Sequence, residues 1–313
     1  MNTAVASSPL SAFARFSEKR QLFEIHSLPL YFLCLIGVLF IAAAIGSGRF
    51  LYDPALVVSV IRDGGIVLAF ACAARWIGFR GIADTVEQLL LMFVAGVVCA
   101  FCSVILASTA APLADPLLRR ADLLMFGIDR GRLIAELHMS PATLRFWTFV
   151  YDSFAVTPTL AMVLLIFTGQ RSRAWALLTA IIGCAVVCIL FILIVPAYGS
   201  PPFPYDYVHV LKGVRDGSLR TLDGSVITGM ITFPSMHAAD AVMLAIAFSW
   251  LGKWAAPLVV LNVLMFFSAM LVGAHYAIDL VGGGVLGVAS IAASLWLHRR
   301  LDASESNRRA PAR

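Results

Sequence analysis

The chain contains 313 residues, of which 60% are hydrophobic and only 13% are charged. A soluble globular domain has about 45–50% apolar and about 25% charged residues, so this composition excludes a protein whose whole surface faces water. Lys and Arg outnumber Asp and Glu by 23 to 18. Because these charges lie in short segments between apolar runs, they do not indicate a nucleic-acid-binding domain. The composition predicts an all-α, polytopic membrane protein built as a helical bundle.

Residues 1–27 are polar and amphipathic and show no signal-peptide pattern, so we expect the first apolar run to be kept as a membrane anchor. About 20 apolar residues of helix cross a bilayer. Runs of that kind predict about eight spans, at residues 28–46, 55–77, 86–110, 143–168, 174–195, 234–251, 254–273 and 276–297. The second run contains Arg62 and Asp63, which must pair or face protein if it spans. A re-entrant or interfacial helix is the alternative for this run.

The distribution of Lys and Arg predicts how the bundle is oriented. With the N-terminus in the cytoplasm, thirteen of these residues lie inside and nine outside, and Arg62 lies within a span. We therefore expect a cytoplasmic N-terminal segment 1–27 and a basic cytoplasmic tail 299–313. Between them lie accessory transmembrane helices 28–110 and a membrane domain 111–298 that holds the candidate site.

The outside charges gather in two long segments, 111–142 and 196–233. The first alternates apolar and charged residues, which predicts an amphipathic helix at the membrane surface. The second is rich in Pro, Gly and Tyr, and a loop longer than about 12–15 residues is usually functional or disordered. The six cysteines all lie in apolar runs and are expected to pack as small apolar residues, with no disulfide framework, metal site or other cofactor.

Two short motifs carry candidate chemistry. Phe233-Pro234-Ser235-Met236-His237 stands where the second long loop enters a span, so Ser235 and His237 lie beside the unpaired N–H groups of a helix start, a favourable place for an anion. His275 and Asp279 are four residues apart, which places them on one helix face and lets the carboxylate hold one imidazole nitrogen.

The 38 positions from His237 to His275 correspond to one crossing out and one crossing back, so both histidines are expected at the same membrane face. Asp240 follows His237 by three residues and either contacts it or serves packing. Gly282, Gly283, Gly284 and Gly287 fit close helix packing better than a phosphate loop. His26, His138, His209 and His298 show no partner pattern.

Pro234-Ser235-Met236-His237 followed by His275-x-x-x-Asp279 resembles the second and third signature motifs of the type 2 phosphatidic acid phosphatase superfamily. The surrounding residues are most similar to its inositol phosphorylceramide synthase-like branch. The resemblance covers roughly residues 115–290. It implies a metal-independent enzyme in which His275 is the nucleophile, Asp279 orients it and His237 is the general acid, and it makes 111–298 the phosphatase or phosphotransferase domain.

The chain departs from the superfamily pattern at two places. It contains no Arg-Pro pair of the first motif, and Ala269 stands where the third motif has Arg. A transferred phosphoryl group needs other donors around its oxygens, and Arg grips two oxygens at once. We therefore predict Arg220, then Arg215, then Lys212 as substrate-binding residues together with Ser235. The next candidates are Arg119, Arg120, Arg130 and Arg132.

The predicted function is an integral-membrane phosphatase or phosphotransferase that acts on a lipid-linked phosphate at the extracytoplasmic face, in phospholipid or sphingolipid metabolism. Its partners would be a lipid phosphate in the bilayer and, for transfer, a hydroxyl of a lipid or sugar. The motifs leave hydrolysis and transfer open. Two alternatives remain: a transporter or flippase in which His237, Asp240, His275 and Asp279 relay protons, and an inactive lipid-binding relative.

Overall fold

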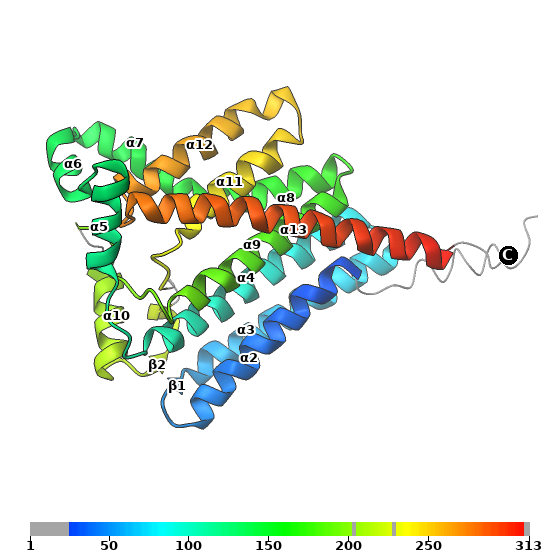
Figure 1. The fold of residues 1–313 in the computed structure, drawn as a ribbon. Helices are drawn as coiled ribbons and strands as arrows, with labels where there is room; N and C mark the ends of the chain where they lie inside the picture. Colours follow the sequence, from blue (N-terminus) through cyan, green and yellow to red (C-terminus); the bar gives the residue numbers. More distant parts are fainter. Residues whose placement is uncertain (1–24, 202–204, 227–229, 310–313) are drawn as a thin grey trace, which may run out of the picture.

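The structure, a computed structural model, describes residues 25–201, 205–226 and 230–309. These form an all-α bundle, as the composition predicts (Figure 1). The first half contains α2 (Leu28–Gly46), α3 (Pro54–Ile77), α4 (Arg80–Ala107), α5 (Asp115–Phe126), α6 (Arg130–Leu137), α7 (Pro141–Asp152) and α8 (Thr157–Phe167). The second half contains α9 (Arg171–Phe191), α10 (Tyr205–Asp216), α11 (Met236–Ser249), α12 (Ala256–Leu271) and α13 (Ala277–Arg309). Two-residue strands β1 (Leu51–Tyr52) and β2 (Thr221–Leu222) pair in parallel.

Helix boundaries follow the capping residues of the sequence. Asp53 accepts a hydrogen bond from the Ala55 N–H at the start of α3, and Ser140 accepts one from the Thr143 N–H at the start of α7. Each of these helices has Pro in its first turn, where the missing N–H costs no hydrogen bond. Gly78 ends α3 with φ of 104°, a conformation that side chains disfavour.

All eight predicted apolar runs are helical. Within the described residues, six helices are long and apolar enough to cross a membrane, and α7 and α8 together form a further candidate bent by 51°. The remaining run, α11, has 14 residues and is shorter than a full span. The second run is a continuous helix of 24 residues, α3, which matches a span better than a re-entrant segment.

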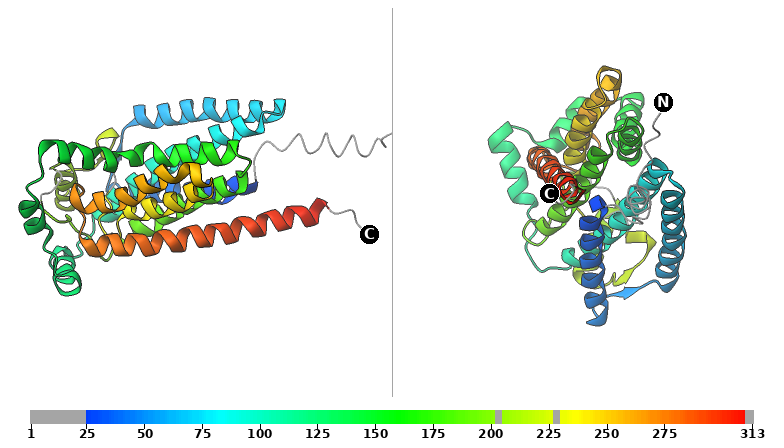
Figure 2. Two further views of the ribbon diagram at one scale, coloured as in Figure 1. Left: turned by 90° about the horizontal axis from the view of Figure 1, so that it is seen from above. Right: turned by 90° about the vertical axis from the view of Figure 1, so that its right-hand side faces the viewer.

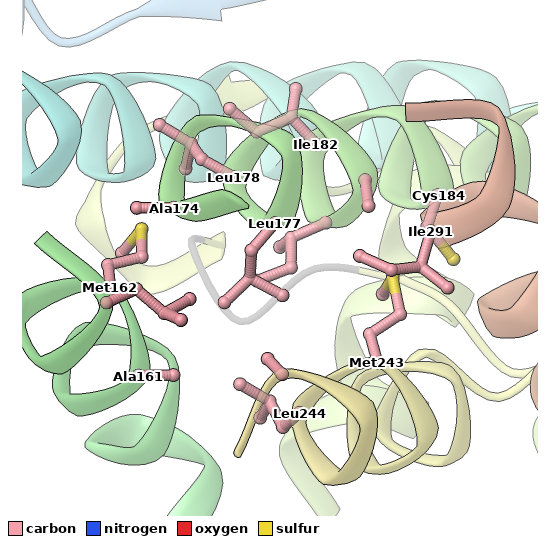
Figure 3. Close-up of a cluster of buried hydrophobic side chains, with 14 of the residues drawn as sticks. Ala161, Met162, Ala174, Leu177, Leu178, Ile182, Cys184, Met243, Leu244 and Ile291 are labelled. Carbon is pink, nitrogen blue, oxygen red and sulfur yellow. The ribbon is translucent and has the colours of Figure 1, made fainter. Parts of the chain in front are cut away.

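Helix α9 lies at the centre of the bundle and packs against α4, α8, α11 and α13. Leu177 and Ile182 of α9, Met162 of α8, Met243 of α11 and Ile291 of α13 meet in one buried cluster (Figure 3). All six cysteines are free, and four of them are buried in the bundle, as expected of packing residues.

The glycines of α13 allow it to lie directly against α11, as predicted. A Cβ added to Gly283 would come within 2.2 Å of the Ser235 carbonyl oxygen, and one added to Gly287 within 2.6 Å of the Ala239 carbonyl oxygen. The first turns of α11 and α13, which carry the two motifs, are therefore in backbone contact.

The segment 111–142 is two helices, not the single amphipathic helix expected. Gly127, with φ of 67°, ends α5, and the Asp129 side chain caps α6 by accepting from the Arg132 N–H. Together with α10 these helices cover one end of the bundle, and the far end of α13 lies at the opposite end (Figures 1 and 2). That opposite end also holds the start of α2, since His26 Nδ1 lies 2.8 Å from His298 Nδ1.

The predicted terminal segments are described in part. Residues 1–24 and 310–313, and the prolines Pro202 and Pro204 of the long loop, lie outside the described residues. The tail predicted from residue 299 begins as a continuation of α13, which runs to Arg309.

Candidate active site

His275 stands in the short connection between α12 and α13, with its ring orientation set by two acceptors. Its Nδ1 lies 3.0 Å from the Thr232 carbonyl oxygen and 3.4 Å from Asp279 Oδ2. A carbonyl oxygen only accepts, so Nδ1 carries the proton and Nε2 keeps its lone pair. Burial lowers the pKa of His275 to about 4, with a smaller contribution from the nearby positive charge of Arg130. The ring is therefore neutral at neutral pH, as a nucleophile must be.

Asp279 lies in the first turn of α13 and is fully buried. Its Oδ2 also accepts a hydrogen bond of 2.8 Å from the Tyr276 N–H. Its backbone carbonyl accepts from the Ser235 N–H at 3.0 Å, which connects the start of α13 to the start of α11. The predicted His275–Asp279 contact is thus present, and the Tyr276 N–H holds the same carboxyl oxygen, Oδ2, in place beside the imidazole.

His237 is the second residue of α11. Its ring stacks on Tyr151 with ring centroids 4.2 Å apart, and its Nδ1 lies 3.3 Å from the Tyr151 hydroxyl oxygen. Phe154 covers the ring at a centroid distance of 4.9 Å. The rings of His237 and His275 are 6.1 Å apart, so the structure brings the two histidines to one place, as their spacing in the sequence predicts.

Both histidines line a cavity of about 440 Å³ inside the bundle. Most of its wall is apolar, and its apolar residues include Met92 of α4, Pro158 of α8 and Ile182 of α9. Its polar lining includes Ser103, Tyr151, Tyr198, Tyr207 and Thr232. The arrangement joins a small polar region at the histidines to a larger apolar volume at the depth of the transmembrane helices.

Two carboxylates of α5 hold the loops around His275. Asp115 accepts hydrogen bonds from the N–H groups of Tyr198 and Gly199 at 3.0 and 2.9 Å. Asp122 accepts from the N–H groups of Ala277 and Ile278 at 2.8 Å each, and so caps α13 from another helix. Burial raises the pKa of Asp122, while these two backbone bonds lower it.

Arg130, at the start of α6, is buried and binds backbone carbonyls on two separate segments. Its guanidinium donates to the carbonyl oxygens of Met270 and Gly273, both at 2.5 Å. It also donates to those of Ser200 at 2.9 Å and Pro201 at 2.5 Å. Burial lowers the pKa of Arg130 to about 10, which leaves the group charged at neutral pH. Arg130 therefore fixes the backbone that leads into His275.

The sequence analysis assigned no individual role to Asp115 or Asp122, because it interpreted 111–142 as an amphipathic helix at the membrane surface. The sequence feature that could have indicated these roles is the spacing of the aspartates in this segment. Asp115, Asp122 and Asp129 recur every seven residues, a period that keeps acidic side chains on one side of a helical segment.

The structure does not bring Arg220 or Arg215 to the histidines. Arg220 donates to the carbonyl oxygens of Arg49 and Gly48 at 3.1 and 3.2 Å, and Arg215 donates to that of Ala111 at 2.6 Å. Backbone acceptors in other loops hold both guanidinium groups, so neither can serve as the predicted phosphate clamp without leaving those bonds.

Lys212 and Ser235 lie nearer to the cavity. The Lys212 ammonium is 6.0 Å from the ring centroid of Tyr198, a residue of the cavity wall. Ser235 is fully buried and caps α11, its Oγ accepting from the Ala238 N–H at 3.3 Å. The Ser235 side chain thus shapes the helix start and is not open to a ligand.

The other candidate residues have separate surroundings. Arg119 donates to Asp129 at 2.5 Å, and Arg132 lies 3.6 Å from Glu136. Asp240 is fully buried, and neither of its carboxyl oxygens has a hydrogen-bond partner among the described residues. It is not part of the cavity wall. No hydrogen bond therefore connects Asp240 to His237 as a proton relay would require.

These features define a polytopic helical protein with a buried His–His–Asp site at one end of the bundle. The family model described as PAP2 superfamily matches residues 117–293, more than half of the chain, so the chain belongs to this superfamily. The matched region contains the two motifs, α11 and the first part of α13, and it leaves α2, α3 and α4 outside.

A curated relative is the protein named undecaprenyl-diphosphatase BcrC from Bacillus subtilis (strain 168), which is 30% identical over 135 residues. The alignment covers 41% of this chain and 62% of the relative, so the chain spans less than two thirds of that relative's length. No solved structure matches the chain. The narrower likeness to inositol phosphorylceramide synthases stays a prediction.

Proposed function

We propose that the protein is an integral-membrane enzyme that removes a phosphoryl group from a lipid-linked phosphate through a phosphohistidine at His275. The observation that carries this proposal is the pair of histidines with rings 6.1 Å apart in the wall of a largely apolar cavity. This separation leaves room for a phosphorus atom between a nucleophilic nitrogen and a proton donor. Membership of the PAP2 superfamily and the name of the relative support a lipid phosphate as the substrate class.

In the proposed first step, Nε2 of His275 forms a bond to phosphorus and the bond from phosphorus to the leaving oxygen breaks. Protonated His237 gives its proton to that oxygen, so the alcohol or phosphate product leaves without extra negative charge. Thr232 and Asp279 hold the Nδ1 proton of His275 and stabilise the positive charge that develops on its ring. In the second step, neutral His237 takes a proton from water, whose oxygen attacks phosphorus and releases His275.

The equatorial oxygens need positive charge, and the structure offers sources other than Arg220 and Arg215. Met236 and His237 begin α11 and line the cavity, and a helix start offers unpaired backbone N–H groups and the positive end of the helix dipole. The Lys212 ammonium lies 6.0 Å from the ring centroid of Tyr198, which is part of the cavity wall. The guanidinium of Arg130 brings a positive charge close to the site, because it donates a hydrogen bond to the carbonyl oxygen of Gly273, two residues before His275. We propose that Lys212, which the sequence analysis ranked after Arg220 and Arg215, attracts the phosphate group to the site.

The apolar wall from α4, α8 and α9 suits the hydrocarbon part of a lipid. Burying each CH₂ group contributes about 0.8 kcal/mol, so a chain in this cavity adds binding free energy that a soluble phosphate ester lacks. The proposed enzyme therefore prefers lipid phosphates to short water-soluble esters. Whether water or a hydroxyl acceptor attacks the phosphohistidine determines hydrolysis or transfer, and we propose hydrolysis as the basal reaction at the extracytoplasmic face, with both termini in the cytoplasm.

The test is phosphate release from lipid phosphates and diphosphates by the purified full chain in detergent, together with trapping of acid-labile phosphohistidine. His275→Ala is expected to abolish both signals. His237→Ala is expected to slow formation of the intermediate by roughly 10²–10⁴-fold, the usual contribution of a general acid, and least with leaving groups that need no proton. His209→Ala, an exposed histidine of α10, is the matched control and keeps both signals.

Trapped phosphate in His275→Ala would contradict the assignment of the nucleophile. Phosphate release that is equal for all four proteins would contradict the site as a whole. Addition of a lipid or sugar alcohol distinguishes the two reactions, since a transferase forms a new phosphodiester or phosphomonoester at the expense of free phosphate.

A further inference from the structure

An ion pair on the outer face of α3 has no role in the proposed reaction. Arg62 Nε lies 2.7 Å from Asp63 Oδ1, and Arg62 Nη2 lies 3.2 Å from Asp63 Oδ2. Both side chains are open to the surroundings, with exposed fractions of 65% and 59%. Of the apolar stretch of α3 that could span the membrane, only 6% is buried inside the structure.

The position of this pair along α3 places it in the hydrocarbon layer. Arg62 is the ninth residue of a helix that begins at Pro54, so it lies about 12 Å from the helix start at a rise of about 1.5 Å per residue. The hydrocarbon layer is about 30 Å thick. Charged side chains at such a depth are costly toward lipid and normally face protein. The outer face of α3 therefore needs a protein cover.

The same face is shaped for close contact with another helix. Gly65 and Ala69 follow Arg62 at spacings of three and seven, and both are exposed. A Cβ added to Gly65 would meet nothing within 4 Å, so the surface there is open. Small residues four apart let two membrane helices approach closely.

A groove of about 390 Å³ runs beside this face between α3 and α4. Its wall includes Ser59, Asp63, Gly64 and, from α4, Leu90 and Phe93. The exposed side chains of Val58 and Ile66 flank the small residues on α3. The face thus presents both a recess and projecting apolar side chains, as a self-complementary contact requires.

We propose that this face of α3 binds a second copy of the same chain. A two-fold axis brings the Arg62 of each copy opposite the partner's Asp63. The two ion pairs then form one network of four charged side chains inside the contact. The face carries one positive and one negative group side by side, and this arrangement is complementary to itself. In such a dimer the guanidinium and carboxyl groups bind each other in place of lipid, and the side chains around Gly65 and Ala69 enter the partner's groove.

This contact lies outside the region matched by the superfamily model, residues 117–293. None of Arg62, Asp63, Gly65 and Ala69 lines the cavity that holds His237 and His275. The dimer proposal is therefore independent of the proposed reaction, and its failure would leave that reaction untouched.

The experiment uses full-length copies with two different affinity tags, expressed together and purified through one tag in lipid nanodiscs large enough for two copies. Wild-type copies are expected to purify together. Asp63→Arg copies alone, or Arg62→Asp copies alone, are expected to lose co-purification by roughly tenfold or more, because like charges then face each other across the axis. An Asp63→Arg copy mixed with an Arg62→Asp copy restores opposite charges, and co-purification returns toward the wild-type level.

The mixed pair controls for folding, since each variant must be folded to restore the complex. Gly65→Leu, which fills the contact without changing charge, is expected to reduce co-purification, and Gly46→Leu at an equally open position of α2 is the matched control. Failure of wild-type copies to purify together, or failure of the mixed pair to recover, overturns the proposal. Capture of a different protein that depends on Arg62 and Asp63 overturns it as well, because the occupant would then not be a second copy.

Discussion

Replacing Arg130 by Met is expected to destabilise the protein and to displace His275. The four bonds from the guanidinium to carbonyl oxygens, at about 1.5 kcal/mol each, contribute about 6 kcal/mol. Burial lowers the pKa of Arg130 to about 10, and this unfavourable burial of the charge offsets about 3 kcal/mol of that contribution. The net loss on removing Arg130 is therefore about 3 kcal/mol.

The loss should affect activity as well as stability. The carbonyls of Met270 and Gly273 precede His275 by five and two residues, so release of this backbone moves the nucleophile. A displacement of about 1 Å can reduce the rate by roughly 10²-fold. Arg130→Lys keeps the charge and loses the planar fork, so it is expected to recover part of the stability and less of the activity.

The assay is chemical unfolding in a fixed detergent, followed by tryptophan fluorescence, with phosphate release measured on the same samples. Arg132→Met is the matched control, because Arg132 lies on the same helix with a side chain that is 80% exposed. Its effect on the free energy of unfolding is expected to stay within about 0.5 kcal/mol. If Arg130→Met and Arg132→Met unfold at the same midpoint, Arg130 does not hold the loop as the hydrogen bonds indicate.

Three further changes test the surroundings of the site. Burial lowers the pKa of His275 from 6.5 to about 4, so the unfolded chain binds more protons and stability falls by up to about 3 kcal/mol as the pH drops from 6.5 to 4. His275→Gln should remove this part of the pH dependence in unfolding curves, and an unchanged slope would contradict it. Asp122→Ala removes the two bonds to the start of α13 and is expected to lower stability by about 2 kcal/mol, measured by the same unfolding; no loss would mean that water replaces the carboxylate. Gly283→Ala places a Cβ against the Ser235 carbonyl and should cost about 1–3 kcal/mol, whereas Gly46→Ala in open space should be neutral or slightly stabilising.

The fold class and the pairing of the two motifs could be predicted from the amino-acid sequence. Apolar runs of span length can only be helices in a bilayer, since each backbone N–H and C=O must bind within its own segment. Helices α11 and α12 run out and back between His237 and His275 and return the chain to one end of the bundle, and a spacing of four residues joins His275 to Asp279. These are local or one-dimensional rules, and the structure agrees with them: the two imidazole rings are 6.1 Å apart, and His275 Nδ1 lies 3.4 Å from Asp279 Oδ2.

Which charged residues support the site could not be predicted from the sequence and depends on tertiary packing. Arg130 binds the carbonyl oxygens of Met270 and Gly273, which are 140 and 143 residues away in the sequence. Arg220 instead binds the carbonyl oxygens of Arg49 and Gly48, 171 and 172 residues away, and does not reach the cavity. Every residue except proline offers the same backbone donor and acceptor, so such a partner leaves no signature in the side-chain sequence. Proximity in sequence placed Arg220 near the motif. The packing of α5 and α6 across the end of the bundle placed Arg130 there instead.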